Sequence, residues 1–383
     1  MPRHYLDHAS TTQLRPSALD AMLPYLREHF ADPGRVHSDG RSTRVALEEA
    51  REHVAALVGA RPREVVFTSS GTEAINAAVF GAVQRGLDRL DASHAHVVTT
   101  AVEHSAVLES CERAPVDVTA VGVDRRGRFD AEAAVDAIRD DTVLVSVQLA
   151  NHEVGTVQTA VPEIATAARE RGVLVHVDAC AAVGHLDLDF AELGADLCSI
   201  TGHKLGAPKG AAALLVRRGL RVPPLLVGGA QERARRGGIE DVPAIVGFGA
   251  AAAELTEGDR LTTEAVTARA QTDRLVEAAL AVDDVALLGD PDVRVPHLVC
   301  LGVGGVEAEP ILLALDQRGI AVHSGSSCSS EALEPSAVLA AMDVDADRSL
   351  RPSVGWSTVD ADIDAFVVAF AEVVAKLRAM RTG

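Results

Sequence analysis

Apolar and polar residues follow one another in a pattern that predicts short strands and amphipathic helices in alternation. Apolar runs of strand length predict strands, and stretches with helical periodicity between them predict helices. The predicted strands are residues 64–68, 96–100, 116–123, 142–149, 173–178 and 195–200. The predicted helices are residues 15–30, 42–58, 74–85, 105–113, 131–139 and 165–171. This alternation predicts an α/β fold whose mostly parallel sheet is covered by helices on both faces.

The pattern changes after residue 238 and predicts a second, smaller α+β domain. Alanine-rich and long helices are predicted at 241–254 and 263–282, and further elements at 293–303, 309–318, 320–324 and 362–381. A length of 383 residues also favours two domains. We predict a large domain over residues 16–255, and a small domain formed by residues 1–15 and 256–383.

The helix predicted at 42–58 has a clear apolar face. We predict that this face turns inward through five side chains, which are Val45, Leu47, Ala50, Val54 and Leu57.

The polar residues of interest follow the predicted strands directly. They are residues 69–72, His104, residues 151–153, Asp178 and residues 201–204. Ligands of open α/β sheets bind beyond the carboxyl ends of the strands. We therefore expect these residues to form one site.

Composition narrows the possible functions and the compartment. Lys+Arg number 36 and Asp+Glu number 55, a net charge of −19, which disfavours a broad basic face for nucleic acid. The first residues carry no apolar signal segment, and no apolar run is long enough to span a bilayer. The five cysteines contain no CxxC pair, which favours the reducing cytoplasm over a disulfide framework or a metal site.

Lys204 is one of only three lysines, with Lys209 and Lys376, and it follows a Thr-Gly-His turn. A lysine amine can form a Schiff base with an aldehyde, which arginine cannot do. The alternative is that Lys204 is a surface residue after a tight turn.

Three further features match an aldehyde cofactor that carries a phosphate and a pyridine nitrogen. Residues 69–72 offer backbone N–H groups and hydroxyls at a helix start, although a helix N-cap looks the same. Asp178 can pair with a protonated ring nitrogen or simply cap the next helix, and His104 can stack on a flat ring or only begin its helix. Lysine, acid, phosphate cradle and flat neighbour together predict pyridoxal phosphate.

At this point the sequence resembles a known family over nearly its whole length. It is similar to the cysteine desulfurases of the iron–sulfur and nitrogenase type, within the fold-type-I pyridoxal-phosphate enzymes. The motifs are residues 5–12 (YLDHASTT), 67–73 (FTSSGTE), 102–104 (VEH), 151–155 (NHEVG), 176–179 (HVDA), 202–204 (GHK), 229–233 (GAQER), 324–328 (SGSSC), 333–336 (LEPS) and 350–355 (LRPSVG).

The resemblance implies a large domain with a mostly parallel seven-stranded sheet, a homodimer, and conversion of L-cysteine to L-alanine with a sulfur-acceptor protein downstream. It implies that Lys204, Cys328 and His104 are catalytic: Lys204 carries the cofactor, His104 stacks on it and moves protons, and Cys328 takes the sulfur as a persulfide. It implies two sets of binding residues. Cofactor contacts would come from Gly71, Thr72, His104, His152, Asp178, Thr201, His203 and Lys204, and substrate contacts from Arg351 and Asn151.

Cys328 lies in a run of small polar residues, Ser324–Ser330, which suits a thiol that must reach both cofactor and acceptor. Cys180, Cys198 and Cys300 stand in apolar contexts that predict buried, inert thiols, and Cys111 is expected to be structural.

Three positions depart from the family pattern. His152 stands where the family has asparagine, Ala181 where it has glutamine, and Ile239 where a threonine reaches the partner subunit's phosphate. Imidazole can still donate a hydrogen bond, whereas alanine and isoleucine side chains cannot.

Two other functions remain open on the sequence. The chain is alternatively a selenocysteine lyase or another β-eliminating enzyme of the same fold, because sulfur and selenium differ little in size. A third hypothesis is a cofactor-free scaffold for sulfur transfer, which the absence of a yellow colour would reveal.

Overall fold

A seven-stranded sheet forms the centre of the molecule. The structure is a computed structural model that describes residues 3–324 and 336–382. In order across the sheet, the strands are β2 (Val65–Thr68), β8 (Ala212–Val216), β7 (Leu197–Thr201), β6 (Leu174–Asp178), β5 (Thr142–Gln148), β3 (Ala95–Thr100) and β4 (Val116–Val121). Only β8 is antiparallel to both of its neighbours, so the predicted mostly parallel α/β sheet is confirmed.

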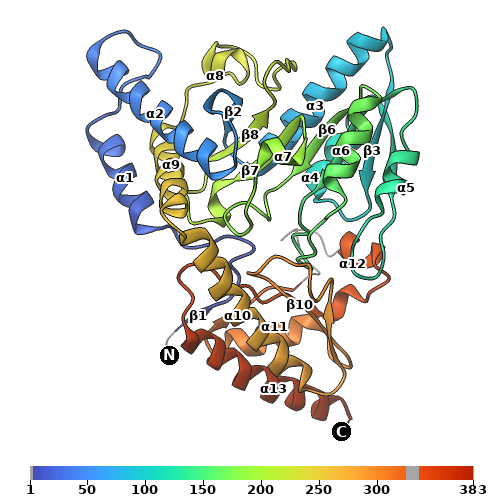
Figure 1. The fold of residues 1–383 in the computed structure, drawn as a ribbon. Helices are drawn as coiled ribbons and strands as arrows, with labels where there is room; N and C mark the ends of the chain where they lie inside the picture. The colour runs from blue at the N-terminus through green and yellow to red at the C-terminus, as the bar shows by residue number, and fades with distance from the viewer. Residues whose placement is uncertain (1–2, 325–335, 383) are drawn as a thin grey trace.

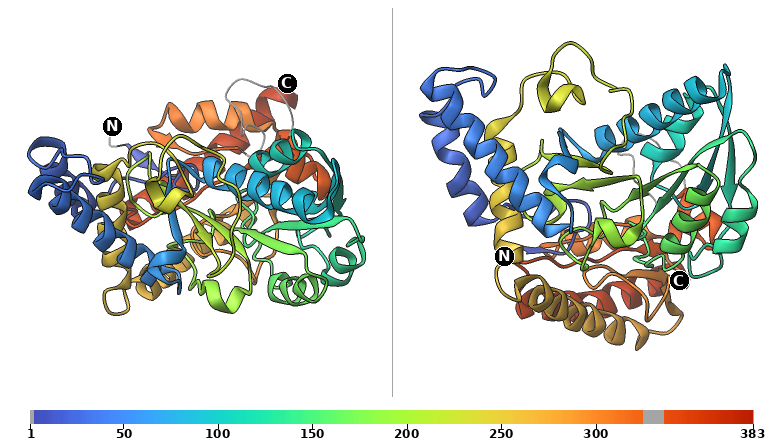
Figure 2. Two further views of the ribbon diagram at one scale, coloured as in Figure 1. Left: turned by 90° about the horizontal axis from the view of Figure 1, so that it is seen from above. Right: turned by 45° about the horizontal axis from the view of Figure 1, so that its top comes forward.

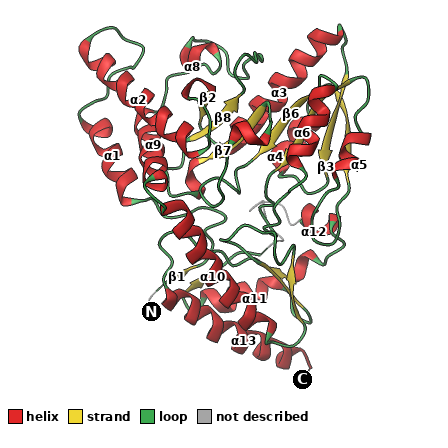
Figure 3. Cartoon of the chain, in the orientation of Figure 1, coloured by secondary structure: helices red, strands yellow, loops and turns green. Residues whose placement is uncertain are grey.

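Helices cover both faces of this sheet, as Figures 1 and 3 show. One face packs against α3 (Gly71–Leu90) and α4 (Ser105–Glu112) through side chains such as Val97 and Leu144. Neighbouring residues in the same strands, such as Val98 and Val145, point to the other face, because side chains alternate along a strand. That face packs against α2 (Ser38–Leu57), α6 (Val161–Glu170), α7 (Phe190–Leu193) and α9 (Val242–Thr256). The short α5 (Ala131–Asp136) lies beside α6, and α1 (Pro16–Arg27) packs on α9.

A second group of elements lies on one side of the large sheet and has its own apolar core. It contains α10 (Arg260–Leu280), α11 (Ala308–Asp316), α13 (Asp360–Thr382) and two small sheets. One sheet is antiparallel, with order β12 (Ser349–Leu350), β10 (Cys300–Val303) and β9 (Val285–Leu288). In the other, β1 (His4–Tyr5) pairs in parallel with β11 (Ile320–Ala321), which brings the N-terminal segment into this group. The N and C marks in Figure 1 both lie here, below the large sheet.

Two short helices complete the fold. They are α8 (Gln231–Ala234), near the edge of the large sheet formed by β2, and α12 (Ala337–Ala341), near β10. The two turned views in Figure 2 show the same arrangement of the large sheet and the α10–α13 group. The domain boundaries at residues 15 and 255 stay a prediction.

One predicted inward side chain is wrong. Val45 is 57% exposed, whereas Leu47, Ala50, Val54 and Leu57 are buried, as predicted. Positions three or four residues apart share a helix face, and Val45 lies only two residues before Leu47, on the opposite side of α2. In the described parts of the chain, no helix combines the length and apolarity that crossing a bilayer requires.

Candidate active site

A pocket of about 430 Å³ lies at the carboxyl ends of the parallel strands β6 and β7. Parallel strands end at the same edge of a sheet, so residues distant in sequence meet there. The lining residues are Ala9, Ser10, Ser70, Gly71, Thr72, Ile75, His104, Ala150, His152, Asp178, Cys180, Ala181, Thr201, His203, Lys204, His323 and Arg351. Among the described residues, the structure thus brings together every predicted site residue except Asn151.

Lys204 closes a single 3-10 turn, Gly202–Lys204, that begins where β7 ends. The N-terminal segment holds this turn, because the Thr12 N–H donates to the His203 carbonyl at 3.0 Å. Burial and the neighbouring lysine charges lower the pKa of His203 to about 4, so its ring is neutral near pH 7. A neutral imidazole at this position can donate one hydrogen bond to an anion.

Asp178 is the last residue of β6 and is 7% exposed. Its Oδ1 accepts from the Cys180 N–H at 2.9 Å, which fixes the carboxylate at the pocket wall. The sequence left open that Asp178 caps the next helix, but the residues directly after it form a turn, and Asp178 lines the pocket.

Two histidines meet across the pocket. The rings of His104 and His152 lie edge to face, with centroids 5.0 Å apart and an interplanar angle of 63°. Burial lowers the pKa of both rings, and the Lys204 charge lowers both further. His104 Nδ1 accepts from the Ala106 N–H at 3.0 Å, so the proton of its neutral ring is on Nε2.

An anion cradle forms where β2 leads into α3. Ser70 caps this helix by accepting from the Glu73 N–H at 3.1 Å. Only glycine fits at position 71, because a Cβ there would lie 2.8 Å from Cys180 Sγ. Beside it, Thr201 Oγ1 is buried and has no hydrogen-bond partner among the described residues. A buried hydroxyl without a partner at a helix N-terminus is suited to a phosphate oxygen.

Arg236 and Glu73 support this cradle, a contact that the sequence did not reveal. Arg236 Nε donates to Glu73 Oε1 at 2.9 Å, and Glu73 Oε2 accepts from the Ser69 N–H at 2.8 Å. Burial opposes the charge on Glu73, yet hydrogen bonds from Arg236 and Ser69 lower its pKa. The turn that presents Gly71 and Thr72 is thereby fixed by a residue far along the chain.

Arg351 enters the pocket from the segment after β12. Its Nη1 donates to the His152 carbonyl at 3.0 Å, and its Nη2 donates to Ser10 Oγ at 2.8 Å. The Nε atom is buried without a partner in residues 3–324 and 336–382. An unsatisfied guanidinium N–H is a donor that a carboxylate can accept.

Asn151 does not line the pocket, although a substrate contact was expected of it. Its Oδ1 accepts from the N–H groups of Glu153 and Val154, both at 2.8 Å, and its Nδ2 donates to the Val102 carbonyl at 3.2 Å. Both ends of this fully buried amide are thus used to shape the turn that presents His152.

Two further predictions have different outcomes. Cys328 lies outside the described residues. Cys111, Cys180, Cys198 and Cys300 are free and buried, which for the last three was predicted from their apolar contexts. Among the departures from the family pattern, Ala181 lines the pocket and Ile239 is 64% exposed.

Ser10, Cys180 and His323 also line the pocket but were not predicted as site residues. Ser10 lies in a run of small polar residues, a pattern from which a place in the site could have been predicted. No periodicity marks His323, which reaches the site because its carbonyl accepts from the Arg351 N–H at 2.7 Å.

The buried carboxyl of Glu103 gives a testable pH dependence of stability. Burial raises its pKa to about 8 although Thr100 Oγ1 donates to it, and the Asp178 charge raises it further. The folded protein therefore holds this proton above the pH at which the unfolded chain releases it. We expect the free energy of unfolding to fall by roughly 2–4 kcal/mol between about pH 5 and pH 8.5 from this group.

Urea unfolding of the wild type and Glu103→Gln at several pH values checks this expectation. Glutamine stays neutral and keeps an acceptor for Thr100, so the variant should lose this part of the pH slope. Parallel stability profiles for the two proteins would contradict the assignment.

Comparisons with known proteins agree with this geometry. The sequence model of the aminotransferase class-V family matches residues 4–366. Cysteine desulfurase IscS of Methanosarcina thermophila is 39% identical over 386 residues, which is 98% of this chain and 93% of that protein. Cysteine desulfurase IscS of Dictyoglomus turgidum is 40% identical over 381 residues, 98% of this chain and 95% of that protein.

Solved structures show the same fold. A NifS-like protein superposes with a TM-score of 0.89 at 29% identity, covering 98% of this chain and 100% of that one. The NifS-like protein of Rickettsia africae superposes with a TM-score of 0.87 at 27% identity, with coverage of 98% and 100%.

The chain therefore belongs to the class-V aminotransferase family, a family of pyridoxal-phosphate enzymes. Within it, the chain groups with the cysteine desulfurases, as its nearly full-length similarity at about 40% identity shows.

Proposed function

We propose that this chain is a pyridoxal-phosphate-dependent cysteine desulfurase. It converts L-cysteine to L-alanine: the Cβ–S bond of the substrate breaks, and its sulfur joins Cys328 Sγ as a persulfide. One enzyme thiol and one cysteine thus yield one enzyme persulfide and one alanine. The observation that carries the proposal is the convergence of Lys204, Asp178, Thr201 and Arg351 on one pocket.

The residues of the pocket fit pyridoxal phosphate. Thr201 Oγ1 is a buried hydroxyl without a hydrogen-bond partner among the described residues. It adjoins Gly71 and Thr72 at the start of α3, which is 20 residues long. These groups, with the neutral His203, would hold the phosphate. Asp178 would hold the ring nitrogen and Lys204 would hold the aldehyde carbon. When bound, the cofactor withdraws electrons from the substrate carbon atoms next to it.

His104 and His152 have separate parts in this proposal. The His104 ring would stack on the cofactor and hold or move a proton at Nε2, since its Nδ1 is already engaged by Ala106. His152 would donate a hydrogen bond to the ring oxygen of the cofactor. Its ring is kept neutral by burial and by neighbouring positive charges, which suits a hydrogen-bond donor more than an acid.

Arg351 would orient the substrate by its carboxylate. The unpaired Nε is the free donor of its fork, and Ser10 and the His152 carbonyl fix the guanidinium plane. Two parallel hydrogen bonds from guanidinium to carboxylate fix direction as well as position.

The proposal also covers the oligomeric state, the compartment and the sulfur acceptor. The enzyme acts as a homodimer in the cytoplasm, with Arg233 and Arg236 near the partner subunit's cofactor. It passes the sulfur to an acceptor protein for iron–sulfur clusters, thio-cofactors or thiolated metabolites, and binds neither nucleic acid nor membrane directly.

Product analysis tests this function. The purified holoenzyme, given L-cysteine and a thiol reductant, should form alanine and sulfide in equal amounts. Arg351→Lys should raise the KM for cysteine by at least about tenfold, because lysine cannot form the two parallel hydrogen bonds. Arg348→Lys is the matched control, since Arg348 pairs with Asp345 at the surface.

Three outcomes would change the proposal. Pyruvate and ammonia instead of alanine would indicate another β-eliminating enzyme. A large preference for selenocysteine would indicate a selenocysteine lyase. A colourless protein that binds sulfur-transfer partners without turnover would indicate a scaffold.

A further inference from the structure

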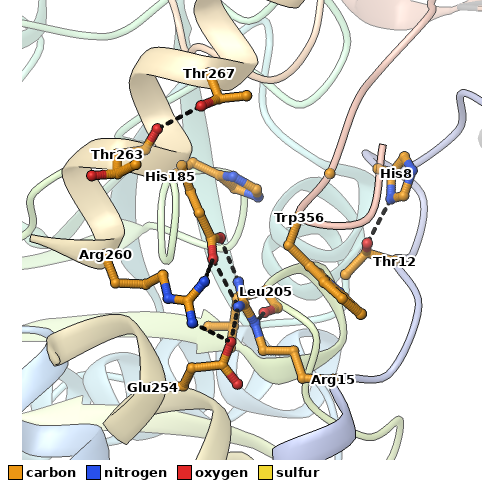
Figure 4. Close-up of polar contacts among 12 residues, drawn as sticks. His8, Thr12, Arg15, His185, Leu205, Glu254, Arg260, Thr263, Thr267 and Trp356 are labelled. Carbon is orange, nitrogen blue, oxygen red and sulfur yellow. Dashed lines mark hydrogen bonds and ion pairs between the residues drawn. The ribbon is translucent and has the colours of Figure 1, made fainter. Parts of the chain in front are cut away.

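A second cavity, of about 250 Å³, lies behind the Lys204 turn. Its walls come from α10, from the Gly184–His185 turn, and from the segment 354–358 (Figure 4). Lys204 is the one described residue that lines both this cavity and the candidate active site. The two spaces are therefore neighbours on opposite sides of the same turn.

A stacked pair of histidines lines this second cavity. The rings of His185 and His297 lie 3.5 Å apart between centroids, with an interplanar angle of 15°. Burial lowers the pKa of both, so two neutral rings stack without charge repulsion. His297 is 1% exposed, and its Nδ1 has no hydrogen-bond partner in the described chain. A buried polar atom left unpaired is costly, which points to a molecule that completes it.

Charged groups of both signs surround the cavity. Arg15, which is 2% exposed, donates to Glu254 at 2.8 Å and to both oxygens of Glu264 at 2.9 and 2.6 Å. Arg260 approaches Glu254 and Glu264 only at 3.7 and 4.0 Å, beyond hydrogen-bond distance. Its half-exposed guanidinium keeps N–H donors for an incoming acceptor, and Figure 4 shows it facing Glu254 across this longer ion pair.

Trp356 forms another part of the wall. Its Nε1 donates to the Gln13 carbonyl at 2.8 Å, and the guanidinium of Arg15 lies 5.5 Å from its ring centroid. Trp356 is the only tryptophan of the 383-residue chain. Its fluorescence therefore reports on this cavity wall without a contribution from another tryptophan, and the Arg260 variants separate this cavity from the active site.

We propose that this cavity is a second, non-catalytic site for a small zwitterionic amino acid, whose carboxylate faces Arg260 and whose ammonium group faces Glu264. Opposite poles on one small ligand match a wall that carries groups of both signs. The ligand's polar atoms would also complete His297 Nδ1. A volume of about 250 Å³ is below the roughly 300–1,000 Å³ of sites for larger ligands.

Binding here would act on Lys204 through the backbone. His185 Nε2 donates to the Lys204 carbonyl at 3.2 Å, and Arg15 Nε donates to the Leu205 carbonyl at 2.8 Å. A ligand that moves either side chain thus changes how the lysine turn is held. This inference uses only the second cavity and stands apart from the proposed desulfurase activity.

Tryptophan fluorescence of the holoenzyme, titrated with L-alanine, tests the proposal. We expect a saturable change with L-alanine, and no saturable change with acetate or ethylammonium, each of which carries one pole only. Arg260→Gln should weaken L-alanine binding at least about tenfold, because a charge-assisted hydrogen bond is lost. Arg260→Lys, which keeps the charge, should restore part of the affinity.

Arg274→Gln is the matched control, because Arg274 lies on the same helix and pairs with Asp360 and Asp364 at the surface. Its affinity should equal that of the wild type. Three results would overturn the proposal and leave a water-filled cavity only: no saturable change, equal binding of acetate, or unchanged affinity in Arg260→Gln. Since Arg260 is half exposed, these variants should fold as the wild type does.

Discussion

Lys204→Ala is expected to stop alanine formation from L-cysteine, with a loss of at least about a thousandfold. Among the described residues that line the pocket, Lys204 is the one with an amine that can both bond an aldehyde carbon and move a proton. Arginine, which supplies nearly all the other cations of this chain, can do neither near pH 7. Alanine and sulfide per enzyme are the quantities to measure, together with the visible absorbance of the purified protein.

Lys209→Ala is the matched control, since Lys209 is exposed and lies only five residues further along. It should keep both the turnover and the visible absorbance of the wild type. Borohydride reduction followed by peptide mass spectrometry should place the cofactor on Lys204. A cofactor fixed on Lys209 or Lys376 would refute this assignment.

The sequence predicts the large sheet well because its strands are short apolar runs between turn residues. It does not reveal β8, the run Ala212–Val216, although every residue of that strand is buried. A hydrophobic run shows that a segment is buried, and it does not show which neighbours it pairs with or in which direction. The insertion of β8 between β2 and β7 depends on tertiary contacts.

Topology explains why the residues of the pocket could be grouped in advance. Asp178 and Thr201 end neighbouring parallel strands, and Gly71 begins the helix after a third strand. Residues at the carboxyl ends of parallel strands share one edge of the sheet, so the prediction needs no knowledge of distances.

The supporting contacts could not be grouped in this way. Arg236 and Glu73 meet although 163 positions separate them, and no pattern links the two segments. The same holds for Arg351 and Ser10, which are 341 positions apart. Asn151 shows the opposite case, because a residue beside the site in sequence is used to shape a turn.

Cys328→Ser is expected to abolish sulfur transfer while leaving substrate binding intact. Binding depends on Lys204, Asp178, His104 and Arg351, which the substitution leaves unchanged. L-cysteine should therefore still alter the visible spectrum of the variant. Alanine should not form, because a serine hydroxyl ionises far too weakly near neutral pH to attack sulfur.

Cys300→Ala is the control for loss of a thiol elsewhere. Burial raises the pKa of Cys300 to about 12, so this thiol is not a nucleophile near pH 7. Its variant should keep sulfur release apart from a loss of stability through packing. In the wild type, mass spectrometry should find an added sulfur on the peptide that contains Cys328.

Alanine formation by Cys328→Ser at the wild-type rate would contradict the persulfide mechanism. The Cβ–S bond would then break without a protein thiol to receive the sulfur. The sulfur would leave as sulfide, and the reducing electrons that alanine requires would have to come from the added thiol. The chemistry of the pocket would then depend on Lys204, the cofactor and the added thiol, and residues 324–330 would have no part in sulfur transfer.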